Sequence, residues 1–307
     1  MSALREINRV AALLEAQAGV ARTSQLRQLG LRRSSLNERL ADGEWQLVGP
    51  SVVVANPGPL TAEQREWATV AAAGPDAALG GLSAAAHHGL KGFDDGQIHV
   101  IVTRGTRPRR NPLPVVIHES RRFDARADVD PARPLPMTRL ERSVLDAAVW
   151  SKRARQAGAR VVAAVQQKLT TAAALGDELG RLGEVRHREF MLSLLADVAG
   201  GPEALGTVDL TRLCRQYSLP KPRNIEVLTD QAGRRRFLEA ELTSRRGKSW
   251  LVEIDAAAHL IVGRYWSDDE PPDDLIVTGD SVLYVPSVDF YLNEIAVMTQ
   301  LHRIIDD

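Results

Sequence analysis

The sequence predicts an α+β protein with more than one domain. Three observations support this class: short helical patterns followed by two short strands near the N-terminus, mixed helix and strand patterns in the middle, and an alternating hairpin pattern near the C-terminus. The chain has 307 residues, 44% of them hydrophobic and 25% charged, which is enough for two or three globular domains. We expect domains at residues 1–57, 58–180 and 181–307.

The first segment has the element order of a helix-turn-helix followed by a wing. Apolar residues at helical spacing predict a helix over residues 7–17, and glycines at 19 and 30 bound a second short helix. A third helix is expected to start at Ser34 or Ser35 and to end at residue 42. Residues 45–54 then read as two short strands about a Gly-Pro turn. This order predicts a winged helix-turn-helix.

Arginine is concentrated in this segment. From Arg22 to Arg39 there are five arginines and one acid, Glu38, whereas the whole chain has 39 basic and 39 acidic residues. We therefore expect affinity for DNA to come from this patch and to fall with salt. Arg33 and Asn37 are the expected base contacts, because arginine reads guanine and asparagine reads adenine. The remaining expected DNA contacts are Arg32, Ser34, Ser35 and Arg39. The alternative is a winged helix that contacts protein.

This segment and the next resemble a known family. Residues 19–26, 29–36, 45–54, 82–86 and 89–90 are similar to AbiEi-type antitoxins of abortive-infection toxin–antitoxin systems, over roughly residues 5–180. Such antitoxins are winged-helix repressors of their own operons, joined to an α/β domain that antagonises a nucleotidyltransferase-like toxin. The resemblance implies transcription regulation and a toxin protein as a partner.

The middle segment contains a basic loop between two expected strands, residues 97–102 and 115–118. From Arg104 to Arg126 there are seven arginines and two acids, so a second phosphate contact is expected at Arg107, Arg109 and Arg110. The alternative is a solvated loop. Helices are expected at residues 61–73, 83–89, 139–150 and 160–174. His87 and His88 are adjacent and point apart on a helix, so we interpret them as packing or cap residues.

Acidic residues mark a hairpin near the C-terminus. Residues 235–242 and 250–255 alternate as two strands around the polar turn 244–248. Because side chains alternate faces, Glu253 and Asp255 share one face, and Glu239 lies near the middle of the first strand. Mg²⁺ takes such oxygen ligands, so Glu239, Glu253 and Asp255 are the candidate catalytic metal ligands, with His259 as a candidate acid or base. The alternative is a solvated acidic face paired with nearby arginines and Lys248.

A second resemblance covers roughly residues 185–305. Glu239 and residues 253–255, 259, 264–269 and 282–284 are similar to the small restriction-endonuclease-like domains related to very-short-patch-repair endonucleases of actinobacterial proteins. The resemblance implies a central sheet flanked by helices, with a metal held by the first acid and the acid-x-acid pair. Two departures concern this site: Glu239 stands where aspartate is usual, and Ala256 where glycine is usual.

Composition limits the remaining classes. One cysteine, Cys214, excludes an internal disulfide and a four-thiolate zinc site. No apolar run is long enough to span a bilayer, and acids stand where a signal peptide would have none, so we expect a cytoplasmic protein without a membrane partner.

Two functions compete on this sequence. The first is a DNA-binding protein, a transcription regulator of antitoxin type, whose C-terminal domain is an inactive nuclease-like fold used for DNA or protein contact. It would act on double-stranded DNA, and a homodimer is the common state of such regulators. The alternative is a Mg²⁺-dependent DNA endonuclease targeted by the winged helix.

Overall fold

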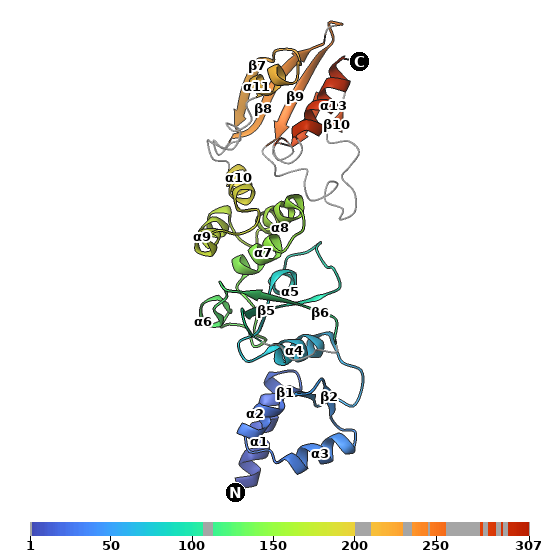
Figure 1. The fold of residues 1–307 in the computed structure, drawn as a ribbon, viewed down its shortest axis with the longest axis vertical. Coiled ribbons are helices and arrows are strands. Elements are labelled where there is room, and N and C mark those ends of the chain that lie inside the picture. The colour runs from blue at the N-terminus through green and yellow to red at the C-terminus, as the bar shows by residue number, and fades with distance from the viewer. Residues whose placement is uncertain are drawn as a thin grey trace. The chain divides into compact units, whose positions relative to one another are not determined.

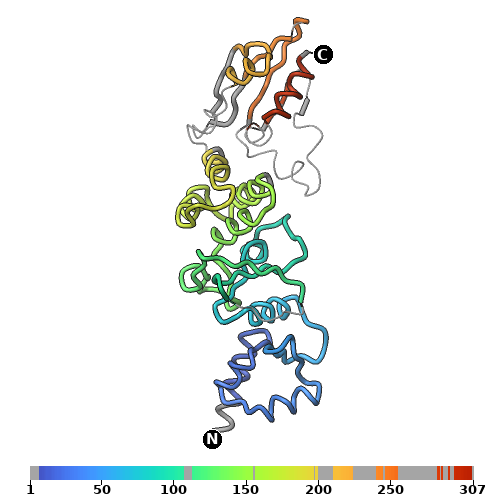
Figure 2. Tube along the Cα trace, viewed as in Figure 1, coloured from blue at the N-terminus to red at the C-terminus, as the bar shows by residue number. Residues whose placement is uncertain are grey.

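A computed structural model describes residues 2–106, 113–199, 210–229, 235–244, 246–255, 277–278, 282–286, 290 and 294–306 (Figures 1 and 2). The expected mixture of helix and strand is confirmed, with three small sheets among these residues. The chain divides into two compact units, Met1–Asp146 and Ala147–Asp307. The finer division into three domains, with boundaries at 57–58 and 180–181, stays a prediction.

The first unit opens with a helical module and a small antiparallel sheet. Its elements are α1 (Ser2–Ala16), β1 (Val20–Arg22), α2 (Thr23–Gln28), α3 (Arg33–Ala41), β2 (Gln46–Val48) and β3 (Val52–Val54), and the sheet has the order β1-β3-β2. The expected helices and hairpin are confirmed. Strand β1 is not predicted by the sequence, in which Gly19 marks only the end of a helix. It pairs with β3 through Val20 and Val54, so the sheet has three strands.

Two clusters of buried side chains hold this module. Val10, Leu26, Trp45 and Val53 form a core between α1, α2 and one face of the sheet. The other cluster joins Val20, Val52 and Val54 to Trp67 and Val70 of α4 (Ala62–Ala73). Residues before and after position 57 therefore share one continuous core.

Helix α4 begins where the sequence predicts, and its first turn is capped. Thr61 Oγ1 accepts a hydrogen bond from Gln64 N at 3.1 Å, and Gln64 Oε1 accepts one from Thr61 N at 3.2 Å. This reciprocal pair satisfies backbone donors that the first turn leaves open. Gln64 Nε2 also donates to Ala18 O at 3.1 Å, which ties the start of α4 to the turn before β1.

The rest of the first unit contains a second small sheet. Its elements are β4 (Ala78–Leu79), α5 (Gly81–His87), β5 (Ile98–Thr103), β6 (Val115–Ser120) and α6 (Ala125–Asp128), and the sheet has the order β4-β5-β6. Strand β5 runs antiparallel to β4 and parallel to β6. The two strands expected on either side of the basic loop are therefore confirmed. The structure adds that they are neighbours in the sheet.

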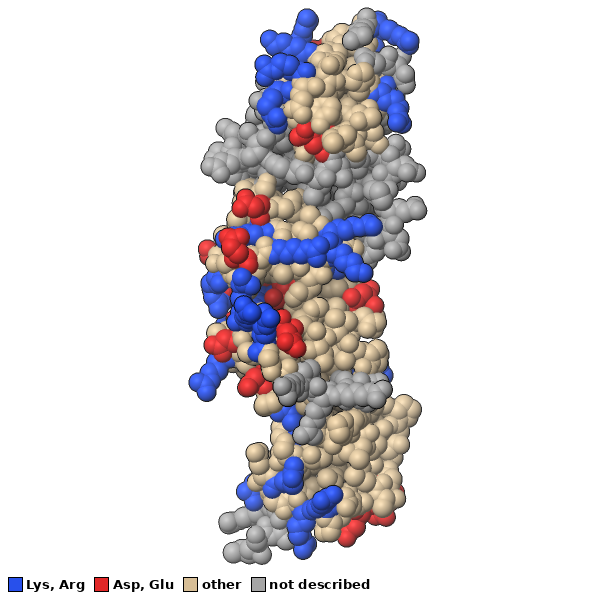
Figure 3. Space-filling model, viewed as in Figure 1, with Lys and Arg blue, Asp and Glu red and all other residues tan. Residues whose placement is uncertain are grey.

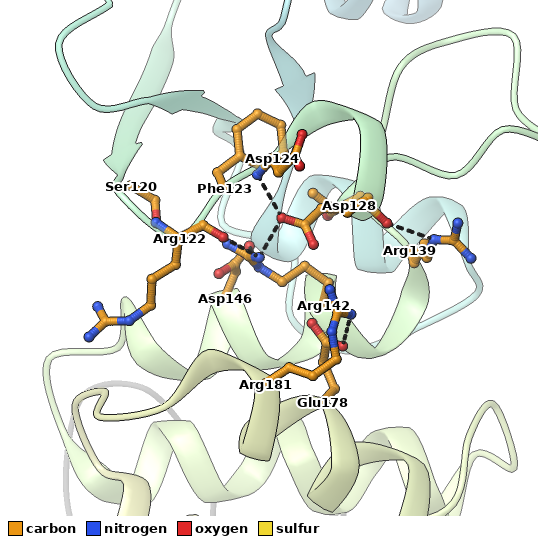
Figure 4. A network of polar contacts seen from close by, with 12 residues as sticks. Ser120, Arg122, Phe123, Asp124, Asp128, Arg139, Arg142, Asp146, Glu178 and Arg181 are labelled. Atoms are coloured by element: carbon orange, nitrogen blue, oxygen red, sulfur yellow. Dashed lines mark hydrogen bonds and ion pairs between the residues drawn. The ribbon is translucent and has the colours of Figure 1, made fainter.

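A buried ionic network anchors α6 to α7 (Leu140–Val149), as Figure 4 shows. Arg142 is 3% exposed, and its Nη1 and Nε lie 2.7 Å from Asp128 Oδ2 and 2.9 Å from Asp146 Oδ2. Asp128 Oδ2 also accepts a hydrogen bond from Asp124 N at 2.9 Å. One guanidinium thus forms ion pairs with two buried carboxylates, which would otherwise be costly to hold away from water.

The second unit begins with three helices: α8 (Ala154–Gln166), α9 (Ala172–Leu182) and α10 (Arg188–Ala199). The expectation of one helix over residues 160–174 is wrong. The chain turns after α8, with Lys168 at a φ of 58°, and Thr171 Oγ1 then accepts a hydrogen bond from Ala174 N at 3.1 Å. The apolar run continues across this break, but the threonine cap starts a new helix whose Leu175 and Leu179 are buried.

A five-stranded sheet forms the rest of this unit, with the order β10-β11-β9-β8-β7. Its elements are α11 (Leu210–Gln216), β7 (Arg223–Thr229), β8 (Arg235–Thr243), β9 (Ser249–Asp255), β10 (Val277–Thr278), β11 (Val282–Pro286) and α13 (Glu294–Asp306). The expected hairpin of β8 and β9 is confirmed, and Gly247 in its turn has a φ of 85°. One face of the sheet packs on α11 and α13, with Val252, Ile254 and Leu301 in the core.

None of the described helices is both long and apolar enough to cross a membrane.

Candidate nucleic-acid interface

Helix α3 presents a polar face to solvent. Arg33, Ser34 and Asn37 are exposed, and no residue of the helix is buried. Arg33 and Asn37 are four positions apart, which places them on one side of the helix. Leu36 and Leu40 pack against the core of α1, α2 and the sheet. The structure therefore places the two expected base-contacting residues one turn apart and exposed, beside the leucines that pack α3 on the core.

The start of α3 has a positive electrostatic character. Arg32 is the N-cap residue, exposed and extended at φ −70° and ψ 147°, and its side chain makes no capping hydrogen bond. The first turn contains no acidic residue. Unpaired N–H groups and the helix dipole favour anions at such an end, and two arginine charges lie beside it. Ser35 is half-buried in the same turn.

Arg39 has partners of its own. Its Nη1 lies 3.3 Å from Glu44 Oε2, and its guanidinium carbon lies 5.0 Å from the centroid of the Trp45 ring. The two charged side chains are 42% and 59% exposed, so this ion pair contributes little to stability. Contact with the ring adds a cation–π attraction. A phosphate contact by Arg39 stays a prediction, and it would compete with Glu44.

The basic loop of the middle segment is described only at its edges. Arg107, Arg109 and Arg110 lie outside the described residues, while Arg104, Arg121 and Arg126 are exposed. Figure 3 shows basic and acidic side chains mixed on the visible face around α5 to α9, and mostly basic ones around the N-terminal helices. A second phosphate contact at the loop stays a prediction.

The acidic residues of the C-terminal hairpin occupy one row of the sheet. Glu239 of β8 pairs directly with Glu253 of β9, and Glu226 of β7 pairs with Glu239 on its other side. Asp255, paired with Phe237, lies two positions from Glu253 and shares its face. This face is opposite to the one that packs on α11 and α13. The sequence placed Glu239 and Glu253 on adjacent strands, and the structure adds that they are directly paired.

A divalent cation takes ligands of the residue types in this row. Residues directly opposite on adjacent strands have Cβ atoms about 4.5–5.5 Å apart, and like charges there destabilise a sheet. A Mg²⁺ ion takes carboxylate oxygens and would offset that repulsion. Within the described part of the chain, no group of three or more His, Cys, Asp or Glu side chains is placed to hold a metal. His259 and the side chains of Glu226, Glu239 and Asp255 lie outside that part, so the metal site stays a prediction.

The sequence reasoning missed Glu226. It lies on the strand before the hairpin, and its pairing with Glu239 follows an irregularity in register between Arg223 and Glu226. Counting residues along the chain cannot place a strand across such a shift, because one added residue exchanges the two faces.

His87 and His88 at the end of α5 have different hydrogen-bond partners. His87 Nε2 lies 2.9 Å from Glu66 Oε2, and this hydrogen bond raises the pKa of His87. His88 Nε2 lies 2.9 Å from Thr138 O, where α5 ends. The two rings thus have separate partners, as expected of packing and cap residues.

A pair of histidines, His99 buried and His118 half-buried, was not expected from the sequence. His99 Nε2 lies 2.9 Å from Asp95 Oδ2, and its Nδ1 lies 3.0 Å from His118 Nε2, with the rings stacked at 5.3 Å. Burial, with a smaller contribution from the charge of His99, lowers the pKa of His118 to about 4. The only sequence signal is the four-residue spacing of Asp95 and His99, because His118 reaches them through the pairing of β5 and β6.

Comparison of the chain with models of known protein families and with curated proteins found no match.

Proposed function

We propose that this chain is a double-stranded-DNA-binding regulator of the antitoxin type that reads DNA with α3. The observation that carries the proposal is that Arg33, Ser34 and Asn37 are exposed on a helix that Leu36 and Leu40 pack against the core. The element order of helix, strand, two helices and a β-hairpin is that of a winged helix, which supports the same conclusion.

In this proposal α3 enters the major groove, which is wide enough for a helix. Arg33 reads guanine through two hydrogen bonds and Asn37 reads adenine, each contributing about 1–3 kcal/mol of discrimination between bases. Arg32, Ser34 and Ser35 at the helix start bind phosphates, which fixes the position of α3 on the duplex. The hairpin of β2 and β3 serves as the wing. Its Leu47 side chain is 54% exposed, so it is open to contact.

A toxin protein and a second copy of the chain are the partners that the antitoxin assignment adds. Both partners are proposed because antitoxins of this type bind a toxin and regulators of this kind are commonly dimers. Light scattering on the purified chain tests the homodimer, and co-purification with the product of a neighbouring gene tests the toxin.

The cross-strand row of Glu226, Glu239 and Glu253 favours a second candidate, a metal-dependent DNA endonuclease targeted by α3. Glu239, Glu253 and Asp255 would hold Mg²⁺, which when bound supplies an activated water and stabilises charge at phosphorus. His259 would act as an acid or base. If the domain is inactive, the same sheet face serves DNA or protein contact.

Selection from random duplexes tests the regulator. We expect the full chain to enrich one motif and Asn37→Ala to bind that motif about 5- to 100-fold more weakly. Arg65→Ala is the control, since Arg65 is an exposed arginine on α4, away from α3. Failure of the wild-type chain to enrich any sequence contradicts the proposal.

Cleavage of supercoiled plasmid separates the two candidates. Nicking that requires Mg²⁺ and disappears in Glu253→Gln makes the chain an endonuclease. If the wild type and Glu253→Gln bind DNA equally and neither nicks it, the chain is a regulator with an inactive nuclease-like domain. Glutamine keeps the size of the side chain, so a loss of nicking would report the loss of a carboxylate oxygen.

A further inference from the structure

A pocket of about 520 Å³ lies between α2 and the C-terminal end of α4. Its polar lining includes Arg22, Ser24, Arg27, Gln28, Ser51 and Thr106, and its floor is formed by the small residues at 71–75. No acidic residue lines it within the described part of the chain. Its volume is in the range of small-molecule sites.

Among the residues that the structure describes, no acidic side chain forms an ion pair with the half-buried charge of Arg22 at this pocket. Its Nε donates to Ala71 O at 2.9 Å and its Nη2 donates to Gly74 O, so both acceptors are neutral carbonyls. Asp76 is near enough to influence Arg22 but forms no ion pair with it, and burial lowers the pKa of Arg22. A guanidinium removed from water is costly unless a charge balances it. The arginine is therefore placed to accept an anion.

Arg27 adds a second cation at the opening. It is exposed, and its Nε donates to Thr23 O at 3.3 Å. Since a guanidinium has five N–H donors, others remain for a ligand. The hydroxyl groups of Ser24, Ser51 and Thr106 supply further donors around the same space. Two arginines with surrounding hydroxyls suit a phosphate, whose oxygens accept several charge-assisted hydrogen bonds.

We propose that this pocket binds a phosphate group between Arg22 and Arg27. The phosphate comes either from a small phosphorylated molecule, for which the pocket volume leaves room, or from the backbone of bound duplex. Because Arg22 joins β1 to α2 and bonds to the end of α4, a bound phosphate bridges α2 and α4. A small molecule there would therefore couple to DNA affinity. The duplex source and this coupling rest on the proposed DNA-binding function, whereas binding of a phosphate group by itself does not.

Titration with pyrophosphate tests the site without DNA. The full chain is titrated by calorimetry with sodium pyrophosphate, against sodium chloride at matched ionic strength. Arg27→Gln removes the exposed cation, and Arg65→Gln is a matched control, because Arg65 is also exposed, also donates to one backbone carbonyl (Leu60 O at 2.8 Å), and lies outside the pocket lining.

We expect pyrophosphate to bind the wild type and Arg65→Gln equally, and Arg27→Gln about tenfold more weakly, as for loss of one charge-assisted hydrogen bond. No binding by the wild type, or equal affinity of Arg27→Gln, overturns the site. Circular dichroism of each variant establishes that the fold is kept.

Duplex binding by the same variants identifies the source of the phosphate. If Arg27→Gln also weakens duplex binding and lowers the slope of log affinity against log salt by about 1, the phosphate belongs to the DNA backbone. If duplex binding is unchanged while pyrophosphate binding is weakened, the site takes a small molecule. Pyrophosphate binding can succeed when duplex binding fails, so the two proposals fail separately.

Discussion

Replacing Arg142 with methionine should strongly destabilise the first unit. Arg142 lies between Asp128 and Asp146 at 2.7 and 2.9 Å, and all three side chains are 3–7% exposed. Methionine fills much of the same space but leaves two buried carboxylates without their cation. Breaking a buried pair in this way costs about 3–5 kcal/mol. Because Arg142 forms ion pairs with both Asp128 and Asp146, we expect a cost in the upper part of that range.

The matched control is an exposed pair in the same unit. Arg133 Nε lies 3.8 Å from Asp130 Oδ2, and the two side chains are 42% and 23% exposed. Arg133→Met should cost less than about 1 kcal/mol, because such pairs are screened by water.

Urea unfolding of the full chain, followed by tryptophan fluorescence and by circular dichroism, measures both changes. The first unit has to unfold as a separate transition for a free energy to be assigned to it. A cost for Arg142→Met as small as that for Arg133→Met would refute the reasoning from burial.

Four further predictions rest on other contacts. Gly158→Ala should lower stability by about 1–2 kcal/mol, because a Cβ there would lie 2.8 Å from Phe190 Cε1. Gly176→Ala, within a helix and with no atom within 4 Å of the new Cβ, should raise stability by about 0.5–1 kcal/mol; urea unfolding that gives both variants the same sign contradicts this. Thr61→Ala should cost about 1 kcal/mol through loss of the α4 cap, and an unchanged urea midpoint would count against it. His118 stays neutral in the folded chain down to a pKa of about 4, against 6.5 in the unfolded chain. Its stabilising contribution is therefore present above pH 6.5 and is lost as the pH falls towards 4. Thermal unfolding from pH 4 to 7.5 should show a weaker pH dependence in His118→Gln, and equal slopes would contradict it.

The sequence predicts elements well where the pattern is local. The start of α4 follows from Thr61 and Gln64, and the hairpin of β8 and β9 follows from the alternation around the turn at Gly247. The direct pairing of Glu239 with Glu253 follows from the length of that turn. Each of these features depends on residues that are close in the sequence.

Features that depend on distant pairing could not be predicted in this way. Strand β1 has three residues and no alternation to identify it, and it exists because Val20 pairs with Val54. His118 approaches His99 only through the parallel pairing of β5 and β6. The pocket at Arg22 needs α4 to pack beside β1 and α2, which no spacing in the sequence reports. Tertiary contacts decide all three features.

The measurement that tests the central claim most directly is the affinity of wild type and Arg33→Ala for duplexes that differ at single base pairs of the selected motif. The account predicts that wild type discriminates a guanine at one position by about 1–3 kcal/mol, and that Arg33→Ala loses this discrimination at that position alone. Equal loss of affinity at every position, or no loss, would show that α3 does not read the bases.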